Sequence, residues 1–169
     1  MAHATSARAV DHDRERTPAQ WYCLLAGLAL LLAGIFGFIS DSSFDTGDAV
    51  DGSSFLGFEV NGIHNLVHLA SGLVLLAASR KRASARAVAI AFGLVYGVVT
   101  IIGLIDGTDV LGLLPVNAAD NVLHIALSAL GILTGLISRS DYRGTTVTDR
   151  DAGARFGRDT TTTREHTRR

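Results

Sequence analysis

Four apolar runs without Asp, Glu, Lys or Arg restrict the fold of this chain more than any other feature of its sequence. They cover Trp21–Ser40, Ile63–Ser79, Ala87–Ile105 and Asn121–Ser138. A helix that crosses a bilayer needs about 20 mostly apolar residues, within a range of about 17–25. A helix in a soluble bundle keeps one polar face, and these runs have almost none. The runs therefore predict an all-α fold, a four-helix transmembrane bundle whose main partner is the lipid bilayer.

The segments outside these runs are polar and lack the apolar periodicity of a helix. Residues 1–19 and 139–169 cannot bury enough apolar surface to offset the entropy lost on ordering. We expect both to be disordered cytoplasmic tails on either side of a membrane domain at residues 20–138. The formal net charge is −1, so no nucleic-acid partner is indicated.

The placement of basic residues predicts the orientation in the membrane. The loops at 41–62 and 106–119 contain no Lys or Arg, whereas basic residues gather in the middle link and at the start of the C-terminal tail: Arg80, Lys81, Arg82, Arg86, Arg139 and Arg143. Cytoplasmic loops carry the excess of Lys and Arg. The pattern predicts a multi-pass protein of the cell membrane with both termini in the cytoplasm. Trp21 and Tyr22 are expected to anchor the inner interface as aromatic residues.

An internal repeat lies within the membrane domain. Val60–Ala70 recurs as Val116–Ala126, with Val, two Asn, His and Ala at the same offsets. A Leu-Gly pair precedes each copy, at residues 56–57 and 111–112. The repeat predicts two helical hairpins, at residues 20–79 and 87–138. Because each unit has two spans, both units share one orientation, as in parallel repeats about an axis along the membrane normal.

The repeated segments also place ionisable side chains at the start of the second and fourth helices. His64 and His68 are four residues apart, as are Asp120 and His124, so each pair shares a helix face. Under the repeat, His64 corresponds to Asp120 and His68 to His124. We expect these four residues to form a polar cluster that joins the two helices on the extracytoplasmic side. Four asparagines support it as helix caps and neighbours: Asn61, Asn65, Asn117 and Asn121.

Three interpretations of this cluster remain open. His and Asn can hydrogen-bond across membrane helices, each contact contributing about 0.6–2 kcal/mol. Three imidazoles and one carboxylate can also bind a transition metal, and His68 with His124 can ligate a haem as an axial pair. A proton or small-solute pathway is the third, although the inner halves of the second and fourth helices offer only Ser and Thr. We favour the structural interpretation and predict no cofactor, with a metal or haem as the alternative.

Small residues at four-residue spacing predict close helix packing, which such residues allow in lipid. They are Ala33, Gly37, Gly93, Gly97, Gly131 and Gly135. The spacing leaves open whether the contacts lie within one chain, in a homo-oligomer or with another membrane protein. The lone cysteine, Cys23, excludes an internal disulfide. The sequence contains no complete catalytic set, so we expect a non-catalytic protein rather than an enzyme.

The two asparagine- and histidine-bearing segments, at residues 61–68 and 116–124, and the four-span layout resemble the domain-of-unknown-function 4383 family of small actinobacterial membrane proteins. The resemblance covers about residues 20–138. It implies a four-helix bacterial membrane protein and no assigned activity.

Overall fold

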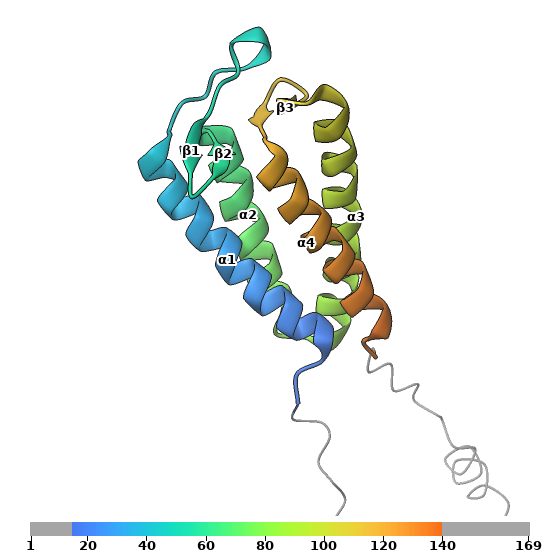
Figure 1. Cartoon of the computed structure of the whole chain (residues 1–169). Coiled ribbons are helices and arrows are strands. Elements are labelled where there is room, and N and C mark those ends of the chain that lie inside the picture. The colour runs from blue at the N-terminus through green and yellow to red at the C-terminus, as the bar shows by residue number, and fades with distance from the viewer. Residues whose placement is uncertain (1–14, 140–169) are drawn as a thin grey trace, which may run out of the picture.

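A computed structural model of the chain describes residues 15–139. Within them, four helices form an antiparallel bundle: α1 (Pro18–Ser40), α2 (Gly62–Ala78), α3 (Arg82–Asp106) and α4 (Ala118–Ile137). Both ends of the described chain lie at one end of the bundle, and the long loops lie at the other (Figure 1). The expected all-α class is confirmed. Most of the two expected tails lies outside the described residues.

Three of these helices are long and apolar enough to cross a membrane: α1, α3 and α4, with 23, 25 and 20 residues. Helix α2 has 17 residues, at the lower limit of the range for a span. Large apolar side chains point outward along the bundle, among them Leu25, Ile35, Leu104, Ile125 and Leu133. Monomeric soluble proteins rarely expose so continuous an apolar surface, so the outer surface fits a bundle surrounded by lipid.

Helices α1 and α3 begin before the apolar runs, and at α1 the extra turn is capped. Thr17 and Gln20 form a capping box, with Pro18 in the first turn, so α1 begins two residues before the expected domain start at residue 20. Helix α3 begins at Arg82, five residues before the expected second unit at residue 87. Arg82 and Arg86, expected in a link, therefore belong to α3. Arg86 Nε donates to the Gly135 carbonyl, 3.2 Å away, at the end of α4.

Glycines bring the helix backbones into direct contact within each hairpin. A Cβ atom added to Gly72 would lie 2.7 Å from the Leu31 nitrogen and 2.8 Å from the Gly27 carbonyl oxygen. Between α3 and α4, a Cβ atom at Gly93 would lie 2.7 Å from the Ser128 carbonyl oxygen, and one at Gly131 would lie 2.8 Å from the Ala89 carbonyl oxygen. These close approaches are between helices of the same chain. The sequence had left open whether such contacts lie within one chain or between chains.

The other predicted packing residues have different surroundings. A Cβ atom at Gly135 would meet Ile90 and the Arg86 carbonyl, and one at Gly37 would meet the side chain of Asn65. At Gly97 it would meet only the hydroxyl of Ser128, at 3.0 Å. Ala33 lines an open groove, described below.

Side chains of α1 tie the two hairpins together. The Tyr22 hydroxyl donates to the Leu127 carbonyl of α4 at 2.8 Å, and the Cys23 thiol lies 3.5 Å from the Ala85 carbonyl of α3. Tyr22 is buried, whereas Trp21 is exposed. The expectation that Tyr22 anchors an interface was therefore wrong, because its hydroxyl has a carbonyl partner inside the bundle.

Each long loop contains a β-hairpin that the sequence reading did not anticipate. Strands β1 (Ser53–Phe55) and β2 (Phe58–Val60) pair antiparallel, as do β3 (Asp109–Val110) and β4 (Leu114–Pro115). A one-turn 3₁₀ helix, η2 (Gly47–Ala49), precedes the first hairpin. We call this side of the bundle the hairpin end. The β1–β2 hairpin folds back over the bundle between α1 and α4 (Figure 1).

The Leu-Gly pairs form the tips of these hairpins. Leu56 and Gly57 have φ of 54° and 91°, and Leu111 and Gly112 have φ of 58° and 64°. Two successive positive φ angles match the right-handed twist of a hairpin. A non-glycine residue in this region costs about 1–2 kcal/mol, so each half of the molecule holds the same local strain at its tip.

Candidate functional site

The capping asparagines of α2 and α4 reach across the molecule. Asn61 Oδ1 accepts from the His64 backbone nitrogen at 2.8 Å, and Asn117 Oδ1 accepts from the Ala119 and Asp120 nitrogens. Their Nδ2 groups donate to the loop of the other helical hairpin. Asn61 donates to the Leu113 carbonyl at 3.1 Å, and Asn117 donates to the Gly57 carbonyl at 2.9 Å. Each cap thus holds the tip of the opposite loop.

The Asp120 carboxylate is engaged by backbone groups. Its Oδ2 accepts from the Asn117 nitrogen at 3.0 Å and from the Glu59 nitrogen at 2.9 Å, which joins α4 to β2. Asp120 is buried, and a buried carboxylate needs such donors. It is not part of the group whose ligand atoms converge. Asp120, the fourth residue of the predicted cluster, therefore does not belong to the group of ligand atoms that the three histidines form.

The hydrogen bond by which Asn117 joins the two helical hairpins can be tested by substitution. Asn117→Ser keeps a hydroxyl that can cap α4 but removes the donor to Gly57. Because one net hydrogen bond contributes about 0.5–1.5 kcal/mol, we expect a loss of about 1 kcal/mol in the free energy of unfolding. Asn117→Ala should cost more, since it also removes the cap. Thermal unfolding in detergent measures both; equal stability of the Ser variant and the parent would contradict the cross-hairpin role.

Asn65 and Asn121 pack against glycines of the neighbouring helix. Asn65 Nδ2 donates to the Asp41 carbonyl at 2.9 Å, which fastens the end of α1 to α2. A Cβ atom at Gly103 would lie 2.8 Å from Asn121 Oδ1. Gly37 and Gly103 thus occupy corresponding places before the ends of α1 and α3. Sequence reasoning missed Gly103, although it precedes the C-cap Gly107 by four residues, as Gly37 precedes Asp41.

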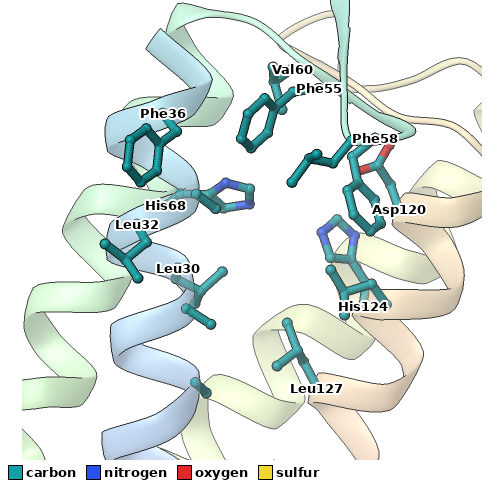
Figure 2. A pocket seen from close by; sticks show the side chains of 15 residues that line it. Leu30, Leu32, Phe36, Phe55, Phe58, Val60, His68, Asp120, His124 and Leu127 are labelled. Carbon is teal, nitrogen blue, oxygen red and sulfur yellow. The ribbon is translucent and has the colours of Figure 1, made fainter. Parts of the chain in front are cut away.

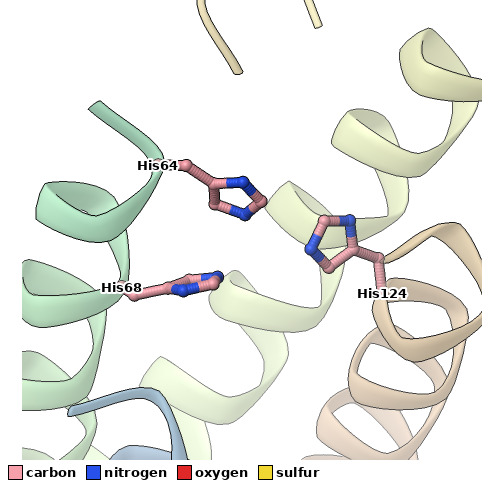
Figure 3. Close-up of side chains that lie close together, drawn as sticks. All are labelled: His64, His68 and His124. Carbon is pink, nitrogen blue, oxygen red and sulfur yellow. The ribbon is translucent and has the colours of Figure 1, made fainter. Parts of the chain in front are cut away.

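Three histidines converge between α2 and α4 near the hairpin end. His64 and His68 come from α2 and His124 from α4, and the rings face a common space (Figure 3). Each histidine offers one nitrogen, and these nitrogens lie within 4.8 Å of one another. The ring centroids are 4.4 Å apart for His64 and His68 and 6.2 Å apart for His64 and His124. The predicted convergence of the three imidazoles is thus present in the fold.

These imidazoles are buried and incompletely hydrogen-bonded. Exposed fractions are 2% for His64, 8% for His68 and 4% for His124. The Nδ1 atom of each ring has no hydrogen-bond partner among the described residues. An unsatisfied buried polar atom costs about 1–3 kcal/mol, and in native proteins such an atom calls for an explanation such as a bound water or ion.

Aromatic side chains of α3 support the cluster. The Tyr96 ring meets the His124 ring edge to face, with centroids 5.1 Å apart, and Phe92 stacks on Tyr96 at 4.1 Å. The Thr100 hydroxyl donates to the Tyr96 carbonyl at 2.8 Å. The two aromatic rings of α3 therefore pack beside the histidine cluster. Tyr96 was not among the residues predicted for the cluster.

Two apolar grooves reach the histidines from opposite sides. The α1–α4 groove, with a volume of about 410 Å³, runs beneath the β1–β2 hairpin and is bordered by His68, Asp120 and His124 (Figure 2). The α2–α3 groove, of about 270 Å³, is bordered by all three histidines and by Tyr96. His68 and His124 therefore stand between the two grooves.

Taken together, these features define a class: a helical protein with three helices long and apolar enough to cross a membrane and a buried, histidine-lined polar site that apolar grooves reach from the side. The model of the family described as Domain of unknown function (DUF4383) matches residues 20–137, and the chain belongs to this family. The expected family is confirmed. No curated protein and no solved structure matches the chain.

Proposed function

We propose that this protein is an integral membrane protein that binds one divalent transition-metal ion through His64, His68 and His124. The observation that carries the proposal is the convergence of three buried imidazole nitrogens within 4.8 Å, with every Nδ1 atom lacking a partner among the described residues. A purely structural role would pair these Nδ1 atoms within the bundle. At the hairpin end, Asn61, Asn117 and Asp120 make hydrogen bonds between the two helical hairpins.

The imidazole nitrogens limit which metal ion or cofactor the site could bind. Neutral imidazole suits Zn²⁺, Cu²⁺, Ni²⁺ and Fe²⁺. Nitrogens bound to one tetrahedral zinc ion lie about 3.3 Å apart, given Zn–N bonds of about 2.0–2.1 Å, so small ring rotations would complete the site. Three protein ligands leave a fourth position open for water or a substrate. A haem fits less well, because a third imidazole borders the space between the axial pair.

We place the bundle across the membrane with its hairpin end outside. The support is the charge asymmetry. The α2–α3 link and the start of α3, at the end of the bundle where the described chain begins and ends, carry Arg80, Lys81, Arg82 and Arg86, whereas the loops at the hairpin end are acidic and free of Lys and Arg. The metal site would then lie beneath the outer face. The matching caps, hairpin tips and glycines of the two halves favour descent from one duplicated helical hairpin.

Metal analysis of the purified protein tests this function. We expect one ion per chain after Zn²⁺ loading in detergent, measured by elemental analysis after gel filtration. Zn²⁺ at 100 times its Kd should stabilise the fold by about 2.7 kcal/mol, seen as a raised Tm. Binding should weaken as the pH falls, because protons compete with the metal for the imidazoles.

The same measurements with Cu²⁺, Ni²⁺, Co²⁺ and Fe²⁺ compare how many ions of each metal bind per chain and how far each raises the Tm. The proposal is overturned if no ion binds stoichiometrically and none raises the Tm.

A further inference from the structure

The α1–α4 groove has the composition of a ligand site. Its α1 wall includes the small residues Ala26, Ala29 and Ala33 beside larger apolar residues, and its α4 wall includes Leu123 and Leu127. The polar groups that line it come from three residues, His68, Asp120 and His124. Apolar walls with a few convergent polar groups, in a volume of about 300–1,000 Å³, are typical of small-molecule sites; this groove measures about 410 Å³.

The groove is reached from the side of the bundle. Leu32, Phe36 and Leu123 line it and are also exposed on the outer surface. Where α1 and α4 cross the membrane, that surface faces lipid, so an occupant would arrive from the bilayer. Ala29 and Ala33 leave room between the helices, and Phe55 and Phe58 of the β1–β2 hairpin border the groove at the hairpin end (Figure 2).

The polar end of the groove selects the head group of the occupant. His68 and His124 are more than nine-tenths buried, border the groove and carry Nδ1 atoms without partners among the described residues. A neutral imidazole nitrogen accepts a hydrogen bond from a hydroxyl group, and a hydroxyl oxygen can also fill an open metal position. The Asp120 carboxylate in the same lining repels carboxylate and phosphate heads.

We infer that the α1–α4 groove binds a membrane-soluble, single-chain amphiphile with an uncharged hydroxyl head, whose hydroxyl meets His68 and His124. The membrane placement rests on the proposed function, whereas the hydroxyl contact needs no metal. The groove and the metal site would then form one centre, in which the amphiphile reaches the histidines from the lipid side.

Binding of radiolabelled 1-dodecanol to the full chain in detergent tests the inference, with the protein both stripped of metal by EDTA and loaded with Zn²⁺. We expect saturable binding of one dodecanol per chain in the metal-free protein. Unlabelled dodecanol should displace the label, and dodecanoate or dodecane should do so at least about tenfold less well, since one lacks a neutral head and the other lacks the hydroxyl.

Ala29→Trp should lower the affinity for dodecanol by about tenfold or more, because the indole fills the groove. The matched control is Leu28→Trp, which adds an indole at the neighbouring, outward-facing residue of the same helix outside the groove lining. It should bind dodecanol as the parent does. Ala33→Trp provides a second obstruction if Ala29→Trp proves unstable. His68→Phe should also weaken dodecanol binding, since it removes the acceptor.

The outcomes separate this inference from the metal proposal. Non-saturable dodecanol binding, equal competition by dodecane, or equal effects of the Ala29 and Leu28 substitutions would overturn the groove site, whatever the metal content. Saturable, Ala29-sensitive binding by a protein that takes up no metal would support the groove site and overturn the metal site alone.

Discussion

Replacing His124 with phenylalanine is expected to lower the affinity for Zn²⁺ by about 100-fold or more and to leave the metal-free protein at least as stable as the parent. Mutation of groups that only orient metal ligands already costs about 10–100-fold in affinity, and this change removes a ligand. Phenylalanine keeps an aromatic ring against Tyr96, where the centroids are now 5.1 Å apart. It also removes the buried Nδ1 atom, which has no partner among residues 15–139 and whose burial costs about 1–3 kcal/mol.

Two readouts separate the interpretations of the cluster. The zinc content after gel filtration reports on the ligand, and the Tm without metal reports on any structural contact. Tyr96→Phe is the matched control, because it alters the neighbouring ring by one hydroxyl and leaves all three imidazoles in place; it should retain zinc. If His124→Phe lowers the metal-free Tm while zinc has no effect on the parent, the histidines act as hydrogen-bonding links between helices.

Gly72→Ala is expected to destabilise the bundle by about 2 kcal/mol, whereas Gly97→Ala should be neutral or stabilising. Both changes gain about 1 kcal/mol of helix propensity. At Gly72, the added methyl group would meet the Leu31 nitrogen at 2.7 Å and the Gly27 carbonyl oxygen at 2.8 Å. These are backbone atoms of α1, so relief requires the helices to separate, and overpacking of this kind costs about 1–3 kcal/mol or more.

The difference between the two glycines depends on what surrounds them. A methyl group at Gly97 would meet only the Ser128 hydroxyl, at 3.0 Å. This hydroxyl donates to the Gly93 carbonyl at 2.7 Å, and as a side-chain group it can shift slightly while it keeps that bond. Thermal unfolding of both variants under identical detergent conditions measures the contrast. A Tm for Gly72→Ala equal to or above that of Gly97→Ala would contradict the close crossing of α1 and α2.

The pattern of apolar runs and histidines was enough to predict the bundle and the three convergent imidazoles. His64 and His68 share a face because they are four residues apart on a helix. His124 occupies the place in α4 that His68 occupies in α2, and both helices run in the same direction from the hairpin end. Two helices that carry the same polar residues at the same end can bring them together without further information.

Other parts of the site could not be predicted in this way. Asp120 shares the i,i+4 spacing of the histidines, yet its Oδ2 accepts from Asn117 and from Glu59 of the other half. The glycines at the α1–α2 crossing, Gly27 and Gly72, do not lie on the stripe identified from spacing. Their importance comes from the position of the neighbouring backbone, which no local pattern encodes.

Local patterns in the chain were enough to predict which segments are helical, where asparagines begin two of them and which residues share a helix face, because these properties depend on neighbours within a few positions. No local pattern could show that Asn117 donates to the Gly57 carbonyl, that Asp120 accepts from the Glu59 nitrogen or that apolar grooves open onto His68 and His124; these follow from the folded bundle. Those contacts join residues more than 50 positions apart. They depend on how far each helix rotates and how closely it crosses its neighbour, which the packing of the whole bundle sets.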